Sequence, residues 1–332
     1  DSRLYARLFP SGEVGRLFTD SAEIRAMLLV EGALAKVQGT FGVIPETAAA
    51  FLHRAAMEVQ IDPAGLAEAT GDNGVSVPGL VAAFRSAMEA PDYAQYAHWG
   101  ATSQDITDTA LMLRLRQMLT LQEDMLKTTV KALGHMAADH ATTPMAARTY
   151  GQHATPTSFG ATVAHWGAPL LDLLAELAKA LSLHDPQRSW HSDRAPVLRL
   201  AGWQMRLAVA LGKMAEDLMI LTQTGIGEVS LGASGASSTM PQKQNPVLPS
   251  AMAATARQVI GLHATLEGAA LHRMDRDGAA WFTEWLVLPQ LCLATTATLI
   301  HGQSLSQTLA PHPEAMLASM ANGQNLIHAE AL

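Results

Sequence analysis

The feature that most restricts the fold is the stretch from Asp105 to Asp139, which contains no proline and a single glycine, Gly134. Its apolar residues, among them Leu111 and Leu115, approximate a stripe along one face of a helix. A helix of this length would measure about 50 Å. So long an element must pack along other long helices, so the stretch predicts a helical bundle.

The rest of the chain agrees with this prediction. The first hundred residues read as short helices broken by turns; Thr19-Asp20-Ser21 can cap one of them, and Pro45 opens another. The chain has 58 alanines and 16 methionines, which favour helix, and only 5% aromatic residues, which favour strand. We therefore expect an all-α protein. Four further long helices are predicted at 157–184, 196–224, 246–273 and 279–309, the last interrupted by Pro289.

Charge and cysteine content exclude several classes of protein. The formal net charge is −8 and no dense basic run is present, which argues against binding to nucleic acid. Cys292 is the single cysteine, so the chain cannot carry a disulfide framework. No 18-residue apolar run and no apolar signal segment at the start are found in the sequence. We expect a soluble cytoplasmic protein that does not bind a membrane.

Three loops rich in small polar residues interrupt the helices, at 98–105, 148–157 and 232–246. Each leads into the start of a predicted helix, where unpaired N–H groups favour anionic ligands. In the third loop, Asn245 could serve as a helix N-cap and Pro246 as the first helical residue, as in an ordinary linker. That reading does not explain why Ser237-Ser238 and Lys243 stand in a glycine-rich loop. The loop therefore predicts a functional segment that closes over a substrate.

Residues 236–246, Ala-Ser-Ser-Thr-Met-Pro-Gln-Lys-Gln-Asn-Pro, resemble the signature loop of the fumarase/aspartase superfamily, with Ala236 in place of its usual glycine. Thr102-Ser103-Gln104-Asp105 and Gln152-His153-Ala154-Thr155-Pro156-Thr157 are similar to its two other active-site segments. The resemblance implies a smaller N-terminal helical domain at 1–104 and a central five-helix bundle at 105–310. Only the start of a C-terminal helical domain, at 311–332, would then be present. It also implies a homotetramer whose sites combine loops from three subunits.

Members of this superfamily make or break C–O and C–N bonds β to a carboxylate, and the resemblance implies the same here, with no cofactor. Ser237 would transfer the proton at carbon, and Lys243 would stabilise the dianionic intermediate. His153 would act on the heteroatom side or pair with a carboxylate. No metal site is expected, since neither an H-E-x-x-H motif nor a cysteine pair is present. The expected substrate-binding residues are His98, Thr102, Ser103, Gln152, Thr155, Ser238, Met240, Asn245, Arg276 (by analogy only) and Trp285.

Two positions distinguish branches of the superfamily. Adenylosuccinate lyases usually follow the glutamate at position 284 with arginine, whereas this chain has Glu284-Trp285. Tyr150 likewise stands where those lyases often have histidine. Both features resemble the lactonizing enzymes of protocatechuate breakdown in the β-ketoadipate pathway. They imply cycloisomerisation of a small polycarboxylate, 3-carboxy-cis,cis-muconate, to carboxymuconolactone.

Two alternatives to this activity stay open at this point, and so does one feature of the mechanism. The first alternative is an adenylosuccinate lyase-type β-elimination that releases fumarate. The second is a structural homologue without activity, as in lens crystallins of this superfamily; the presence of Ser237, His153 and Lys243 argues against it. Whether Ser237 or His153 donates the proton to carbon is also open, because histidine is the better acid near neutral pH.

Overall fold

The computed structural model describes residues 3–180, 190–232, 235–236, 244–274 and 276–322. Helices make up most of this part of the chain, which confirms the all-α prediction. The backbone divides into two compact units. The larger unit comprises Asp1–Gly12, Leu121–Leu271 and Phe282–Leu332, and the smaller one Glu13–Thr120 and His272–Trp281. The domain boundaries predicted at 104/105 and 310/311 stay predictions.

The smaller unit is built from short helices that precede one long helix. Two of its helix starts were predicted: the Thr19 hydroxyl accepts a hydrogen bond from the Ala22 N–H at 3.3 Å, and Pro45 is the N-cap of the next helix. The core contains Met27, Leu28 and Leu52, all almost fully buried. The elements are η2 (Gly12–Phe18), α1 (Asp20–Thr40), α2 (Glu46–Glu58), η3 (Pro63–Leu66), α3 (Ala67–Asn73), α4 (Val77–Ala87), α5 (Pro91–Ala94) and the first half of α6 (Ser103–Asp139).

Two glycines allow α1 and α2 to approach closely. A Cβ atom added to Gly39 would lie 2.3 Å from the Cβ of Ala49, and one added to Gly32 would lie 2.7 Å from the Cβ of Ala56. Side chains at either position would force the helices apart. The pairing of glycine with alanine thus sets the spacing between α1 and α2.

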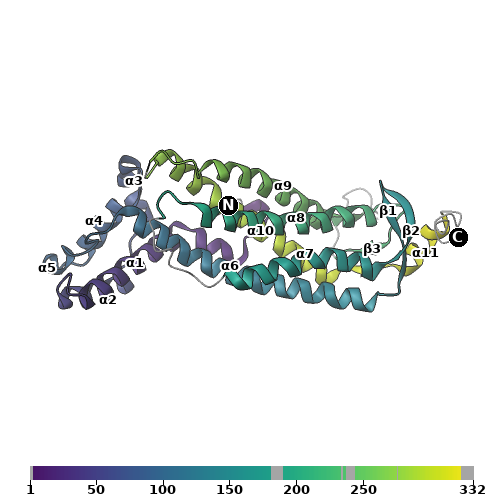
Figure 1. The fold of residues 1–332 in the computed structure, drawn as a ribbon, viewed down its shortest axis with the longest axis horizontal. Helices are drawn as coiled ribbons and strands as arrows, with labels where there is room; N and C mark the ends of the chain where they lie inside the picture. The colour runs from purple at the N-terminus through teal and green to yellow at the C-terminus, as the bar shows by residue number, and fades with distance from the viewer. Residues whose placement is uncertain (1–2, 181–189, 233–234, 237–243, 275, 323–332) are drawn as a thin grey trace. The chain divides into compact units, whose positions relative to one another are not determined.

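The larger unit is a bundle of long helices, and Figure 1 shows the strands β1 and β2 and the short helix α11 at one end of it. The predicted helices are confirmed in number and approximate bounds. Pro289 does not interrupt the last long helix as predicted; the helix continues through it, and the Gln290 side-chain amide donates to the Leu286 carbonyl at 2.6 Å. The elements are η1 (Arg3–Tyr5), the second half of α6, β1 (Pro144–Thr149), β2 (Gln152–Ser158), α7 (Phe159–Ala180), α8 (Ala195–Leu221), β3 (Val229–Ser230), β4 (Gly235–Ala236), β5 (Gln244–Asn245), α9 (Val247–Gly268), α10 (Gly278–Thr308), β6 (Ala310–Pro311) and α11 (Pro313–Asn322).

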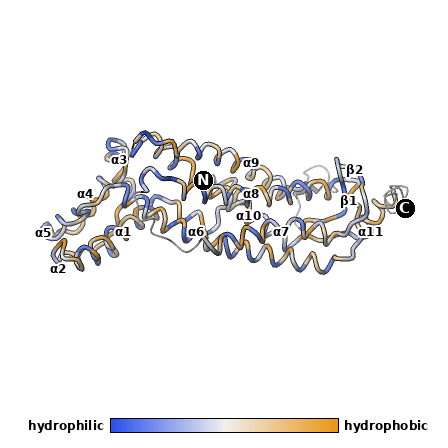
Figure 2. The backbone as a smooth tube through the Cα atoms, viewed as in Figure 1, coloured by the Kyte–Doolittle hydropathy of each residue, from blue (hydrophilic) through white to orange (hydrophobic). Residues whose placement is uncertain are grey.

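A buried polar network fixes the helices of the bundle along their axes. The Gln122 amide donates to Gln204 Oε1 at 3.2 Å and to the Thr296 hydroxyl at 3.0 Å, and Gln204 donates back to Gln122 at 2.6 Å. These residues join α6, α8 and α10 within a core of aliphatic side chains. Figure 2 shows hydrophobic and hydrophilic residues mixed along the helices of the bundle. Because buried polar groups need partners, sliding one helix past another would break the network.

One helix in the described part of the chain, α10, has the length and hydropathy of a membrane span. Of its most apolar window, 67% is buried inside the protein. Core helices of soluble proteins have the same length, hydropathy and burial.

The contact between α1 and α2 can be tested by adding a methyl group to Gly32. We expect Gly32→Ala to lower the free energy of unfolding by about 1–3 kcal/mol, because overpacking outweighs the gain in helix propensity. The matched control is Gly71→Ala in α3, where an added Cβ meets nothing within 4 Å. It should leave stability unchanged or raise it by up to about 1 kcal/mol. Equal stabilities of the two variants in urea unfolding would contradict the close approach.

Candidate active site

The segment between α5 and α6 carries His98 and Thr102, and α6 begins with Ser103; all three residues are expected to bind substrate. Its backbone is unusual, since His98 has a φ of 60° and Gly100 a φ of 69°. A positive φ is rare outside glycine and persists only where the surrounding structure imposes it. The segment therefore needs fixed anchors on both sides.

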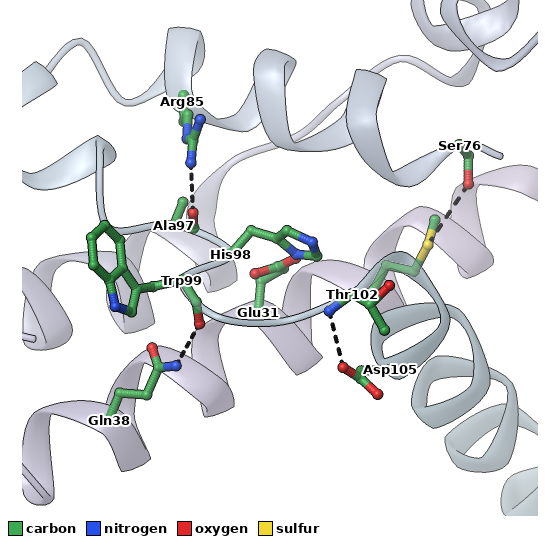
Figure 3. Close-up of polar contacts among 10 residues, drawn as sticks. Glu31, Gln38, Ser76, Arg85, Ala97, His98, Trp99, Thr102 and Asp105 are labelled. Carbon is green, nitrogen blue, oxygen red and sulfur yellow. Dashed lines mark hydrogen bonds and ion pairs between the residues drawn. The ribbon is translucent and has the colours of Figure 1, made fainter. Parts of the chain in front are cut away.

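Figure 3 shows those anchors. Arg85 of α4 donates to the Ala97 carbonyl at 2.8 Å, and Gln38 of α1 donates to the Trp99 carbonyl at 2.7 Å. At the other end, the Asp105 carboxylate accepts from the Thr102 N–H at 3.0 Å, and Ser103 begins α6. The main chain is thus held at both sides of His98, whose ring projects toward α1.

Glu31 of α1 meets that ring. Its Oε1 accepts a hydrogen bond from His98 Nδ1 at 2.7 Å, and the two side chains are only 2% and 19% exposed. The other carboxylate oxygen, Oε2, is buried without a partner among the residues that the structure describes. A carboxylate can only accept, so Nδ1 carries the hydrogen of this bond, and Nε2 is the ring nitrogen that Glu31 does not contact.

Sequence reasoning missed Glu31. A signal was present, because Glu31 continues the buried stripe of α1 formed by Ile24, Met27 and Leu28 at helical spacing. A glutamate on a buried face requires a charged or hydrogen-bonding partner. That requirement could have directed attention to a histidine in a neighbouring loop.

A second strained segment lies beside Thr102. Met274 and Arg276 have φ values of 57° and 58°, and Arg276 Nη1 donates to the Thr102 hydroxyl at 3.0 Å. The structure thus brings together two of the expected binding residues, Thr102 and Arg276. Asp277 anchors the segment: it accepts from the Arg273 side chain at 2.8 Å and from the Ala279 N–H at 3.0 Å. These donors, Arg273 first, hold the pKa of Asp277 well below its usual range.

The second predicted loop is a β-hairpin, which corrects the expectation of an irregular segment. Strands β1 and β2 pair antiparallel through Thr149↔Gln152 and Arg148↔His153. Tyr150 and Gly151, with φ values of 52° and 74°, form the two-residue turn. Positive φ at both central residues is the type I′ geometry, whose twist matches that of paired strands. The expected site residues of this hairpin, Gln152, His153 and Thr155, are all exposed.

The two ends of the signature loop are paired with each other. Gly235 pairs with Asn245 across β4 and β5. Asn245 is not the N-cap of α9, as the sequence had suggested; Pro246 holds that position without a side-chain cap, since Asn245 is engaged in the strand pair. Four expected site residues lie outside the described residues: Ser237, Ser238, Met240 and Lys243.

Trp285 lies on α10 beside a buried ion pair. Arg194, the N-cap residue of α8, donates to both oxygens of Glu284 at 2.9 and 2.5 Å, and each side chain is 5% exposed. The Trp285 ring also packs against Phe282, with 5.7 Å between centroids. The Arg194–Glu284 ion pair fixes the orientation of α10 beside Trp285, the expected specificity position.

The remaining reactive groups in the described part of the chain offer little chemistry. It contains no group of three or more His, Cys, Asp or Glu residues able to hold a metal ion. Burial raises the pKa of the Cys292 thiol to about 12, which keeps it protonated and unreactive. The functional interpretation therefore rests on the segments described above.

Comparison with known proteins identifies the family. A family model described as Lyase matches residues 13–183 and 172–261. The 3-carboxy-cis,cis-muconate cycloisomerase of Pseudomonas aeruginosa is 33% identical over all of this chain and 80% of its own length. Nitrosuccinate lyase of Streptomyces davaonensis is 34% identical over 91% of this chain and 73% of its own length.

A solved structure agrees. The 3-carboxy-cis,cis-muconate lactonizing enzyme from Pseudomonas putida superposes with a TM-score of 0.94 at 30% identity, covering 99% of this chain and 82% of the other. The chain therefore belongs to the lyase family of the fumarase/aspartase superfamily, and it is similar along its whole length to bacterial 3-carboxy-cis,cis-muconate cycloisomerases.

Proposed function

We propose that this protein catalyses the cycloisomerisation of 3-carboxy-cis,cis-muconate to carboxymuconolactone in aromatic catabolism, without a cofactor. The observation that carries the proposal is the superposition on a lactonizing enzyme over 99% of the chain with a TM-score of 0.94. A curated cycloisomerase that is 33% identical over the whole chain supports it.

The reaction requires two bond-forming steps. An oxygen of one substrate carboxylate adds to the carbon–carbon double bond conjugated to a second carboxylate, and its lone pair becomes the new C–O bond. The π electrons move toward the second carboxylate and form a dianionic aci-carboxylate. A proton then arrives at the adjacent carbon, which restores that carboxylate and completes the lactone. No atom is lost, and the proton gained at carbon balances the one that the attacking carboxyl group lost on ionising, so the free acids of substrate and product are isomers.

The described residues supply groups suited to this anionic substrate. Thr102 and Arg276 present a hydroxyl and a guanidinium that already contact each other at 3.0 Å. Ser103 stands at the N-terminus of α6, where the helix dipole favours a carboxylate. An arginine binds a carboxylate through two parallel hydrogen bonds, which orients it as well as neutralising it.

Proton transfer falls to a small set of groups. His98, oriented by Glu31, directs Nε2 away from α1, and His153 is exposed on its hairpin. Ser237 and Lys243 complete the set by resemblance: the serine would deliver the proton to carbon, and the lysine would stabilise the aci-carboxylate. Excluding water around such groups strengthens each interaction with the developing charge.

Glu284 and Trp285 favour the tricarboxylate over a phosphorylated substrate. Glu284 is neutralised by Arg194 inside the protein, and Trp285 offers an apolar ring where adenylosuccinate lyases have a cation. A phosphate needs a cation at such a position. The substitution therefore disfavours elimination from adenylosuccinate.

We further propose a cytoplasmic homotetramer with shared sites. His98 precedes α6 and His153 follows it, and α6 has 37 residues, or about 55 Å of helix. The substrate is far shorter than this helix, so it cannot reach the loops at both ends of one α6. Complete sites would therefore draw their loops from more than one copy. Bundle helices also expose large apolar side chains suited to burial between subunits: Leu171, Val209, Ile220, Ile260 and Leu286.

An ultraviolet assay with two substrates tests the function. We expect loss of absorbance from 3-carboxy-cis,cis-muconate, formation of lactone, and no release of fumarate from adenylosuccinate. Prolonged chelation should leave the rate unchanged. Turnover of adenylosuccinate alone would establish the lyase alternative, and turnover of neither would contradict an enzymatic role in this reaction class.

The signature loop can be tested by three substitutions, after confirming that each variant assembles. Ser237→Ala should lower kcat by about 10²–10⁴-fold with little change in binding, because the hydroxyl acts on the proton in transit. Lys243→Met should weaken substrate binding and also lower kcat by about 10²–10³-fold. Ser238→Ala should lower kcat less than either of the other two substitutions. If Ser237→Ala kept near-normal kcat while His153→Ala abolished it, His153 would be the proton donor to carbon.

The orientation of His98 can be tested by changing Glu31. Glu31→Gln keeps size and hydrogen bonding but removes the charge that holds Nδ1–H. We expect kcat to fall about 10- to 100-fold, a part of the usual contribution of an acid–base group. Glu23→Gln is the control on the same helix, since Glu23 pairs with Arg114 at 3.2 Å. Its kcat should stay within about twofold of the parent; equal losses in the two variants would show that the effect is not specific to His98.

The assembly can be tested by light scattering coupled to gel filtration. We expect a mass near four times the chain mass of 35.3 kDa. Leu286→Glu, which places a charge on an exposed apolar side chain of α10, should reduce the tetramer and the activity together. A stable, active monomer would contradict the shared site.

A further inference from the structure

Two segments of the larger unit that lead to expected site residues are joined by one ion pair. Arg148 of β1 donates from Nη1 to Glu228 Oε2 at 2.9 Å and from Nη2 to Glu228 Oε1 at 2.6 Å. The Glu228 side chain is completely buried and that of Arg148 is 11% exposed. Bidentate pairing of planar groups fixes distance and angle together, which a single contact does not.

The main chain around Glu228 is held independently of its side chain. Its N–H donates to the Leu221 carbonyl at the end of α8 at 2.9 Å, and its carbonyl accepts from the His312 N–H at 2.8 Å. His312 Nδ1 also contacts the neighbouring Gly227 carbonyl at 3.0 Å. The next residue, Val229, begins β3 and pairs with Pro311 of β6. Glu228 is thus a fixed point at the start of the chain segment that leads to Ser237.

Arg148 lies in the hairpin that carries His153. It pairs directly with His153 across β1 and β2, and the type I′ turn follows two residues later. Directly opposite residues of an antiparallel pair project from the same face of the sheet, about 5 Å apart. The register slips between Ala146 and Arg148, so regular pairing with the rest of the hairpin does not by itself fix the His153 end.

We propose that Arg148 and Glu228 are positioning residues that place His153 relative to β3. This inference rests on the proposed function, because it assigns the pair to the site in which His153 acts. Neither residue needs to touch substrate. A bidentate guanidinium–carboxylate bond between the two strand pairs, β1–β2 and β3–β6, sets where the imidazole stands.

A purely stabilising role predicts a different pattern of effects. Buried ion pairs are often no more stabilising than the apolar residues that could replace them, so stability alone gives little reason for this geometry. If the pair acts through His153, its loss should matter only while His153 is present. A general loss of stability would lower activity whether or not His153 is there.

The experiment is a double-substitution cycle on the assembled protein. Arg148→Lys keeps the charge but loses the bidentate fork, and we expect it to lower kcat about 10- to 100-fold with KM changed less than about threefold. In a His153→Ala background the same substitution should change kcat less than about twofold. Glu228→Gln should repeat this pattern. Additive losses in the two backgrounds would overturn the proposal.

The matched control is Arg206→Lys. Arg206 forms a bidentate pair with Glu176 at 2.7 Å for both bonds, but it joins α7 to α8 and is half exposed. Its kcat should stay within about twofold of the parent. Leu218→Ala, in the buried core of α8, controls for lost stability and should not show dependence on His153.

A readout independent of turnover separates this inference from the proposed function. The rate at which diethyl pyrocarbonate acylates His153, followed by peptide mass spectrometry, should change at least about threefold in Arg148→Lys but not in Arg206→Lys. If the parent protein fails to convert 3-carboxy-cis,cis-muconate yet this difference is found, the proposed function is wrong and the positioning role stands. If acylation is the same in both variants, the positioning role is overturned.

Discussion

The burial of carboxylates against specific hydrogen-bond donors is the interaction on which the functional parts of this protein depend. Only 16% of the residues are charged, yet several of the charges are buried, and three of the buried pairs lie at or beside expected site residues. Glu31 of α1 holds His98, Glu228 holds Arg148 of the hairpin, and Glu284 of α10 holds Arg194 at the start of α8. Because an unpaired buried charge costs several kcal/mol, each partner is confined to its place.

The helices supply the rigid frame against which these pairs act. Small residues let helices approach closely, as at Gly32 with Ala56 in the smaller unit and Gly212 with Ala256 in the larger one. The Gln122–Gln204–Thr296 network then fixes their positions along the bundle. A frame of this kind tolerates strained backbone at His98 and Arg276, since neighbouring contacts oppose relaxation of the positive φ angles. The strain is concentrated in segments that carry expected binding residues.

The helical framework could be predicted from the sequence because its signals are local and repeated. Long stretches without proline, a stripe of apolar residues and capping residues such as Thr19 sufficed for the main helices. Pro289 was read as an interruption, because its local effect opposes a helix that tertiary packing nevertheless maintains.

The site was only partly predictable. Short motifs identified His98 and Thr102 as candidates, and analogy alone added Arg276. Their partners are distant in the sequence: Glu31 lies 67 residues before His98, and Arg276 lies 174 residues after Thr102. The hairpin at 144–158 was also missed, since its Tyr150-Gly151 turn lacks the usual Asn-Gly or Asp-Gly signal.

The central claim is that these groups add a carboxylate oxygen and a proton across a double bond. The most direct measurement is the nuclear magnetic resonance spectrum of the product formed from 3-carboxy-cis,cis-muconate in deuterium oxide. We predict a lactone with one carbon-bound deuterium, on the carbon next to the carboxylate that activated the double bond. A lactone without that deuterium, or no lactone at all, would contradict the account.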